Sequence, residues 1–358
     1  MTAAGRFARH TVKLLQDVRR KDVFSCSRAE PVIRFQSTQR SISCDKKMHA
    51  TPSETDLLII GGGEAVRMAY DALSTYEQVA ISYLPDTTNS FPSFEFFETA
   101  EIAIATRNPK AIYLATPVAS HSDLLAKLIE EKKPILVEKP LALNLTQVAG
   151  FNTCDTKRVA VAFRKRFSKV ASAIKSSRGH KPNDHCTVQI IWLAPHPGPN
   201  HWKIKKEIAG GGVLMDIGSH VLDLLEHTIG KISAIHLIDY ELEPRQDTES
   251  YLSLAVHFEN NSDAQVILGW AKEEPFQQIV FSQPNENITW QKDASKPEST
   301  LILTSKNTTR QMICHRNDEY FPMFKEFREF TNGTPADLPT WNDGVRNLAL
   351  ISKIYESL

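Results

Sequence analysis

Two short stretches of the chain carry residue types that could move a proton and polarise an oxygen atom. The segment 210–230 begins with three glycines, and Asp216 and His220 follow at a spacing of i and i+4. That spacing puts a carboxylate and an imidazole on one face of a helix, where the acid can fix the tautomer of the ring and raise its basicity. A second stretch, Val137-Glu138-Lys139-Pro140, offers an ammonium group where a predicted strand ends.

Each of these signals also has a purely structural interpretation. An acid and a histidine four residues apart often form an exposed pair on a helix surface, and a lysine that follows a strand is often simply solvated. The case for chemistry therefore depends on elements that would bring the two stretches together.

The elements predicted around Lys139 alternate between strand and helix. Apolar strands are expected at 57–60, 78–84, 111–115, 134–138 and 159–163, with helices after Gly63 and at 98–106, 120–132 and 146–152. Such alternation predicts a parallel sheet with helices on both faces and ligands at the carboxyl ends of its strands. Gly61, Thr116 and Lys139 all fall at such ends.

The first strand runs directly into glycines, as in a site for a dinucleotide. Gly61-x-Gly63-x-x-Val66 matches the dinucleotide fingerprint, in which free amides at a helix N-terminus meet a pyrophosphate, except that Val66 replaces the third glycine. The acidic residue expected for the ribose diol falls on Tyr83 or Leu84 instead. The sequence therefore does not choose between NAD and NADP.

After residue 167 the rhythm of the sequence changes to long alternating segments separated by turn residues. These segments predict an antiparallel sheet, with strands at 185–193, 233–242, 251–258, 264–270, 277–282, 287–291 and 300–304. The strong helices of this half are the 210–230 element, 319–331 and 342–358. We expect a basic segment at 1–53, a Rossmann-type α/β domain at 54–166, an α+β domain with a large open, mainly antiparallel sheet at 167–340, and a C-terminal helix at 341–358.

Composition excludes several classes of function. Lys and Arg number 42, as do Asp and Glu, so no global basic field is available to hold nucleic acid or an anionic membrane. No membrane span is expected from the apolar runs, and the five scattered cysteines predict reduced thiols and no metal site. Residues 1–53 are rich in arginine and serine, which fits either a mitochondrial transit segment or a disordered tail. We expect a cytoplasmic protein, with a mitochondrial location as the alternative.

With these elements in place, the chain over residues 55–358 resembles the Gfo/Idh/MocA oxidoreductases, the family of glucose-fructose oxidoreductase, inositol dehydrogenase and dihydrodiol dehydrogenase. The resemblance is carried by short motifs that occur in the family's order: Ala115-Thr116-Pro117 with His121, Glu138-Lys139-Pro140, Phe163 to Phe167, Trp202-Lys203, Gly210 to His220, and Asp343-Gly344.

The resemblance implies that Lys139, Asp216 and His220 meet over a nicotinamide ring. His220 would be the base in oxidation and the acid in reduction, Lys139 would polarise the substrate oxygen, and Asp216 would orient the substrate or the histidine. It further implies a set of cofactor-binding residues: Gly61, Gly63, Glu64, Ala115, Thr116, Pro117, His121, Glu138, Pro140 and Arg166. Trp202 and Lys203 would face the substrate, although an ordinary core position suits Trp202 equally well.

The expected function is that of an NAD(P)-dependent oxidoreductase that transfers a hydride between nicotinamide and a small polyol, sugar or related hydroxy or keto compound. The alternative is a catalytically silent regulatory protein on the same fold, because fold alone does not establish function. Val66 and the missing ribose acid favour that alternative, whereas a retained proton relay favours the enzyme. The open sheet predicts a homodimer or a higher homo-oligomer.

Overall fold

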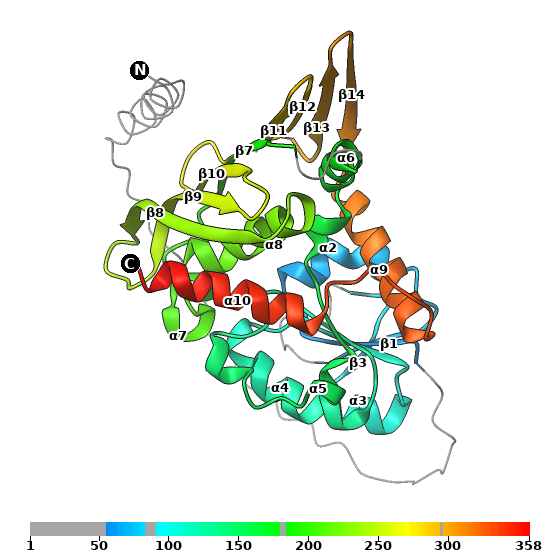
Figure 1. Cartoon of the computed structure of the whole chain (residues 1–358). Coiled ribbons are helices and arrows are strands. Elements are labelled where there is room, and N and C mark those ends of the chain that lie inside the picture. The colour runs from blue at the N-terminus through cyan, green and yellow to red at the C-terminus, as the bar shows by residue number, and fades with distance from the viewer. Residues whose placement is uncertain (1–54, 83–90, 180–183, 294–295) are drawn as a thin grey trace, which may run out of the picture. The chain divides into compact units, whose positions relative to one another are not determined.

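The computed structural model describes residues 55–82, 91–179, 184–293 and 296–358, which lie within one compact unit. The basic segment predicted at 1–53 and the ribose position at Tyr83 or Leu84 lie outside the described residues. Figure 1 shows the course of the chain and the element labels used below.

The first sheet is entirely parallel and has the strand order β3-β2-β1-β4-β5-β6. All of its strands except β3 are wholly buried runs, which is the pattern that helices on both faces require. The order reverses between β1 and β4, so a crevice is expected at the carboxyl ends of those two strands. The strands are β1 (Leu57–Ile60), β2 (Val79–Ser82), β3 (Glu95–Phe97), β4 (Ala111–Leu114), β5 (Ile135–Val137) and β6 (Val159–Val161).

Helices cover both faces of this sheet, as predicted. They are α2 (Glu64–Leu73), α3 (Ala100–Arg107) and α4 (His121–Leu128), the last flanked by the 3-10 turns η2 (Val118–Ser120) and η3 (Ile129–Glu131). The predicted helix at 146–152 is wrong. The chain there forms only the 3-10 turn η4 (Leu145–Gln147) and then the short α5 (Thr153–Thr156), because Asn144 and Asn152 each cap a new start and Gly150 lies between them.

The second sheet has eight strands in the order β14-β13-β12-β11-β7-β10-β9-β8, and all its pairs are antiparallel except β7 with β10. The fold class predicted from the sequence is thereby confirmed. The strands are β7 (Thr187–Pro195), β8 (Ile232–Leu242), β9 (Glu249–Phe258), β10 (Asp263–Ala271), β11 (Phe276–Gln283), β12 (Glu286–Asp293), β13 (Ser299–Ser305) and β14 (Thr308–Cys314).

One face of this sheet packs on the helical segment that carries Asp216 and His220. The segment consists of the short helix α7 (Lys206–Ala209), a π-helical turn η7 (Leu214–Gly218) and α8 (Ser219–Thr228). The stretch Lys206–Thr228 is long and apolar enough to cross a bilayer, but 83% of its apolar window is buried within the protein. It therefore serves here as a core element.

Helix α6 (Lys169–Arg178) and strand β14 are among the elements of the second half that were not predicted. Helix α6 buries only Val170, Ala171, Ile174 and Arg178, so its apolar pattern is weak, although Ser168 caps its start by accepting a hydrogen bond from the amide of Ala171. Strand β14 is exposed along all but its last residue and so lacks the alternation of a half-buried strand.

The last two helices return to the first sheet. Helix α9 (Asn317–Thr331) places Tyr320, Met323, Phe324 and Phe327 in the apolar core beneath α2, so a boundary at residue 340 does not separate the two cores. Helix α10 (Trp341–Tyr355) contributes Trp341 to the other face of the first sheet and Ile351 and Ile354 to the core of the second. Figure 1 shows α10 in red between the two layers.

Candidate active site

The two stretches singled out in the sequence meet. Lys139 lies two residues after the end of β5, and Asp216 lies in the middle of the π-helical turn η7. The Nζ atom of Lys139 donates a hydrogen bond of 2.6 Å to the backbone carbonyl of Asp216 and lies 3.8 Å from its Oδ1. The predicted convergence of an ammonium group from the first sheet with a carboxylate from the second half is therefore present in the structure.

A second lysine and an indole complete the surroundings of the Asp216 carboxylate. Lys203, from the 3-10 turn η6 (Trp202–Ile204), places Nζ 3.0 Å from Oδ1, and Trp270 on β10 donates from Nε1 to Oδ2 at 3.3 Å. Lys203 was predicted to face the site, but Trp270 was missed. Its alternation with Val266 and Leu268 indicates only a core-facing strand residue, and no sequence signal separates an indole that donates from one that merely packs.

The charged groups of this cluster shift one another's pKa values. Burial alone would raise the pKa of Asp216, but the ammonium groups of Lys203 and Lys139 outweigh burial and hold it below its usual value. Burial lowers the pKa of Lys139, with Lys203 adding to the effect, whereas Asp216 raises the pKa of Lys203 despite burial. The site thus presents an ionised carboxylate between two ammonium groups, one of which is closer to losing its proton.

His220 lies one turn further along, in the first turn of α8, and is 7% exposed. Burial, together with the positive charges of Lys139, Arg164, Lys165 and Lys203, holds the pKa of His220 well below its usual range. The ring is consequently neutral near pH 7. Its Nδ1 atom has no hydrogen-bond partner among the described residues.

The predicted contact between Asp216 and His220 does not form. The carboxylate of Asp216 is occupied by Lys203 and Trp270, and His220 is not among its partners. The physical reason lies in the π-helical turn, whose wider winding changes the relative direction of residues that would share a face in a regular α-helix. Asp216 therefore pairs with both lysines and forms no hydrogen bond with His220.

The glycine turn after β1 lies against the end of β4. Gly61 has a φ of +107°, and a Cβ atom there would lie 2.5 Å from the carbonyl oxygen of Ala115. Gly63 precedes α2 without a side-chain cap, and a Cβ atom there would meet nothing within 4 Å. The predicted residues Gly61, Gly63, Ala115, Thr116 and Pro117 therefore share one rim. Open backbone at a helix N-terminus is the environment that a pyrophosphate requires, so these residues fit a dinucleotide.

Glu64 and Lys203 link this rim to the Asp216 cluster. Glu64 is the first residue of α2, and its Oε2 lies 3.9 Å from the Nζ of Lys203. Trp202, the neighbour of Lys203, is partly exposed and stacks at a tilt against His201, with ring centroids 5.6 Å apart. No described polar contact joins Trp202 to Asp216.

The segment around Lys139 is fixed from both sides. The Lys139-Pro140 peptide bond is cis, and the Nδ1 and Nε2 atoms of His121 lie 3.0 Å and 2.9 Å from the carbonyl oxygens of Pro140 and Thr116. Glu138 accepts a hydrogen bond of 2.6 Å from the hydroxyl of Tyr113, and burial raises the pKa of its carboxyl. His121, Glu138 and Pro140 therefore support the loop that holds Lys139 in place.

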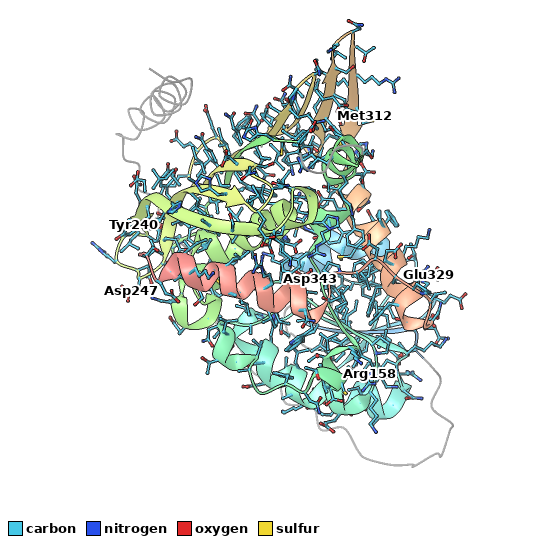
Figure 2. The ribbon with its side chains drawn as sticks, viewed as in Figure 1. Arg158, Tyr240, Asp247, Met312, Glu329 and Asp343 are labelled. Carbon is cyan, nitrogen blue, oxygen red and sulfur yellow. The ribbon has the colours of Figure 1, made fainter. Side chains whose placement is uncertain are left out.

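Arg166 lies apart from this cluster. Its guanidinium pairs with Asp223 at 2.6 Å and with Asp343 at 2.8 Å, which ties the 3-10 turn η5 (Arg164–Phe167) to α8 and α10. Figure 2 labels Asp343 at the start of α10. The predicted cofactor role of Arg166 gains no support from these contacts, because its Nε and Nη2 atoms already donate to the two carboxylates. The positive charge that this turn brings near His220 comes instead from Arg164 and Lys165, neither of which was among the predicted site residues.

Two family models match the chain in the two halves that carry this site. A model described as the oxidoreductase family with an NAD-binding Rossmann fold matches residues 56–163, and a Gfo/Idh/MocA C-terminal domain matches residues 184–282. This chain belongs to the Gfo/Idh/MocA oxidoreductases.

Individual relatives share limited sequence identity with this chain. A levoglucosan dehydrogenase of Pseudarthrobacter phenanthrenivorans is 30% identical over 140 residues, which cover 35% of this chain and 34% of that enzyme. The chain thus spans about a third of the length of this relative. An inositol 2-dehydrogenase of Rhizobium meliloti is 22% identical over 277 residues, or 73% of this chain and 82% of that enzyme.

Solved structures of Gfo/Idh/MocA-like proteins show the same fold at low identity. A levoglucosan dehydrogenase in complex with NADH and levoglucosan superposes with a TM-score of 0.70 at 17% identity, covering 85% of this chain and 97% of that one. A 3-ketoreductase from Actinomadura kijaniata, solved with NADP, gives a TM-score of 0.69 at 15% identity, covering 85% and 98%.

Proposed function

We propose that this chain is an NAD(P)-dependent oxidoreductase that transfers a hydride between nicotinamide and a carbinol or carbonyl carbon of a small polyol or sugar. The observation that carries the proposal is the contact between Lys139 and Asp216, close to a buried and neutral His220. The names of the relatives, levoglucosan and inositol dehydrogenases, support a polyhydroxylated substrate class.

The residues of the site have distinct parts in such a reaction. When bound, the nicotinamide dinucleotide supplies the carbon that accepts or donates the hydride. Lys139 donates a hydrogen bond to the substrate oxygen and stabilises the negative charge that develops there. The unpartnered imidazole of His220 takes the hydroxyl proton in oxidation and returns it in reduction, for which a neutral ring is required. Asp216 holds both lysines at fixed positions.

A catalytically silent sensor on this fold has no use for that arrangement. Burying an imidazole without a hydrogen-bond partner beside ammonium groups lowers the stability of the fold. A role in proton exchange explains why such an arrangement is kept. The site therefore favours the enzyme over the regulatory alternative.

Single substitutions separate turnover from cofactor binding. Lys139→Ala and His220→Ala should each lower kcat with polyol substrates by roughly a hundred to ten thousand-fold, the usual contribution of a proton-transfer residue. Neither side chain belongs to the rim formed by Gly61, Gly63 and residues 115–117, called the glycine rim below. The quenching of NADH or NADPH fluorescence should therefore remain close to that of the wild type. Full turnover in either variant would remove the catalytic assignment, and comparing the two nucleotides would identify the cofactor.

We also propose that two copies of the chain associate through the open face of the second sheet. The buried face carries Val188, Val266 and Phe281, whereas the opposite face presents partly exposed Ile191, Ile267, Val280 and Ile302 on strands of the same sheet. Apolar side chains on an unpaired sheet face favour association with an identical partner. Light scattering at micromolar concentration should report a dimer or larger species, and a monomer would contradict this proposal.

A further inference from the structure

The segment that carries Asp216 begins at an anchor formed by a buried carboxylate. Glu249, the first residue of β9, is 2% exposed. Its Oε1 accepts hydrogen bonds from the amides of Gly212 at 3.0 Å and Leu214 at 2.8 Å, and the hydroxyl of Tyr355 donates to the same oxygen at 3.0 Å. Burying a carboxylate costs free energy unless several hydrogen-bond donors satisfy it. These three hydrogen bonds compensate the cost of burying Glu249.

The glycines of this segment are there for close approach. A Cβ atom on Gly211 would lie 1.8 Å from the hydroxyl oxygen of Tyr355, and one on Gly212 would lie 2.0 Å from the carbonyl oxygen of Glu249. Of the three, only Gly210 has a positive φ, at +78°. The other two glycines therefore let the backbone press directly against Glu249 and Tyr355, which come from β9 and the end of α10.

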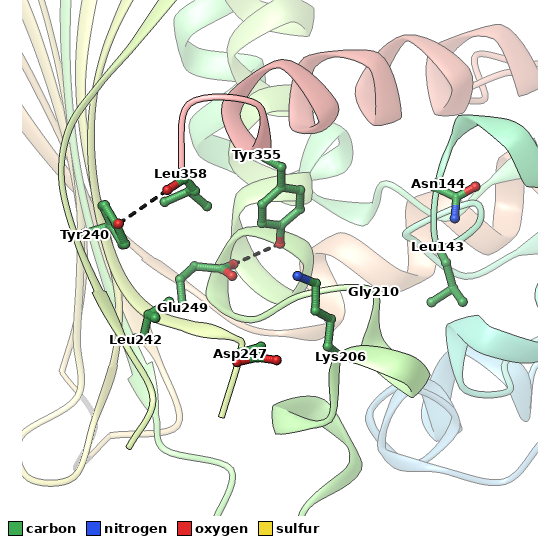
Figure 3. A pocket seen from close by; sticks show the side chains of 10 residues that line it. All are labelled: Leu143, Asn144, Lys206, Gly210, Tyr240, Leu242, Asp247, Glu249, Tyr355 and Leu358. Carbon is green, nitrogen blue, oxygen red and sulfur yellow. Dashed lines mark hydrogen bonds between the residues drawn. The ribbon is translucent and has the colours of Figure 1, made fainter. Parts of the chain in front are cut away.

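The anchor is separate from the Asp216 cluster. Glu249 and Tyr355 line a cavity of about 620 Å³ whose other walls include Lys206, Gly210 and Tyr240. Figure 3 shows the hydroxyl of Tyr355 directed at the Glu249 carboxylate, with Tyr240 turned instead to Leu358 on the same cavity. None of the lining residues is a partner of Asp216. The anchor therefore acts on Asp216 through the adjoining backbone, which Glu249 holds at Gly212 and Leu214.

We propose that Glu249 and Tyr355 are positioning residues: they fix the start of the π-helical turn and thereby hold Asp216 at Lys139 and Lys203. This inference rests on the proposed oxidoreductase function. The turn begins at Leu214, whose amide is held by Glu249, and Asp216 follows two residues later. A small displacement at the anchor moves the carbonyl that receives the 2.6 Å hydrogen bond from Lys139.

The test uses Tyr355→Phe in the full-length protein, with Tyr240→Phe as the matched control. Both changes remove one hydroxyl from the same cavity, but only Tyr355 bonds to Glu249. Tyr355→Phe should lower kcat by about tenfold, within the range that a misplaced catalytic group costs. The Kd for NAD(P)H should stay unchanged, since the glycine rim lies on the other sheet, and Tyr240→Phe should behave as the wild type.

Hydrogen–deuterium exchange supplies a readout that does not depend on turnover. Peptides covering residues 210–220 should exchange faster in Tyr355→Phe than in the wild type or in Tyr240→Phe, whereas peptides covering residues 57–73 should not change. Glu249→Gln should show the same pattern, and the double variant should lose little more than Glu249→Gln alone, because both residues act through one contact.

The outcomes distinguish the two levels of inference. Unchanged kcat in Tyr355→Phe overturns the positioning role, whether or not exchange increases. If the wild type turns over no polyol or carbonyl compound, the proposed function fails, and the exchange data alone then decide whether the anchor holds the 210–220 segment. Equal exchange in all variants would overturn the anchor itself.

Discussion

Removing the charge of Lys203 should shift the pH dependence of the reaction. At an effective dielectric constant of about 20, the Lys203–Asp216 pair at 3.0 Å contributes roughly 5.5 kcal/mol of Coulomb energy, against roughly 4.4 kcal/mol for Lys139–Asp216 at 3.8 Å. At 1.36 kcal/mol per pK unit, the first figure corresponds to about four units as an upper limit. Lys203→Met removes the stronger of the two attractions on the carboxylate.

The sign of the shift follows from the charge. Without the Lys203 ammonium group the ionised form of Asp216 is less stabilised, so the pKa of Asp216 rises, and the pKa of His220 rises as well because a neighbouring cation is lost. Water entering the space, and the remaining Lys139, reduce the effect, so we expect the acidic limb of kcat/KM to move up by about one to two pH units.

The assay is the pH profile of kcat/KM for oxidation, measured at about ten pH values between pH 4.5 and 9. Lys206→Met is the matched control, since Lys206 is exposed, lies three residues further on and is no partner of Asp216. Both variants should bind NAD(P)H as the wild type does. A Lys203→Met profile that superimposes on that of the wild type would refute the electrostatic reasoning.

Two further outcomes can be measured without a substrate. Gly61→Ala should lower the Tm and abolish NADH binding, because the added Cβ would lie 2.5 Å from the carbonyl oxygen of Ala115 and the residue has a φ of +107°. Gly63→Ala should keep the Tm of the wild type, because nothing lies within 4 Å of a Cβ atom there. Equal Tm values for the two variants would contradict this prediction. Burial and neighbouring cations lower the pKa of His227 to about 4, so the unfolded state takes up a proton first and the contribution of this residue to stability is lost as the pH falls from 6.5 towards 4. His227→Gln should therefore show a smaller loss of Tm between pH 7 and pH 5 than the wild type, and parallel losses would count against the assignment.

The first sheet was predictable because its signals are local. Buried apolar runs such as Leu57–Ile60 end directly in turn residues. Gly61 follows such a run immediately, and Lys139 follows the run Ile135–Val137 after one residue. In a parallel sheet the carboxyl ends of the strands share one edge, so linear position along the chain converts into spatial proximity. For this reason the strand pattern alone places Lys139 at the carboxyl edge of the sheet, whereas its role was implied by the family resemblance.

The details of the site were less accessible because they depend on long-range packing. The π-helical turn that separates Asp216 from His220 is not encoded in an i, i+4 spacing, and the donation by Trp270 depends on the register of β10 in its sheet. Arg166 follows a predicted strand as Lys139 does, yet it forms ion pairs with two carboxylates, Asp223 on α8 and Asp343 on α10. Spacing identifies residues that can do chemistry, and packing decides which of them are free to do it.

The return of the last two helices to the first sheet has a consequence for protein engineering. Since α9 completes the core beneath α2 and α10 enters both cores, the second sheet is an insertion between two portions of one scaffold. An exchange of the second sheet between family members should therefore replace an internal block from α6 through β14 and retain both flanks. A chimaera made with a single crossover would remove Phe324 and Trp341 from the two cores that cover the first sheet.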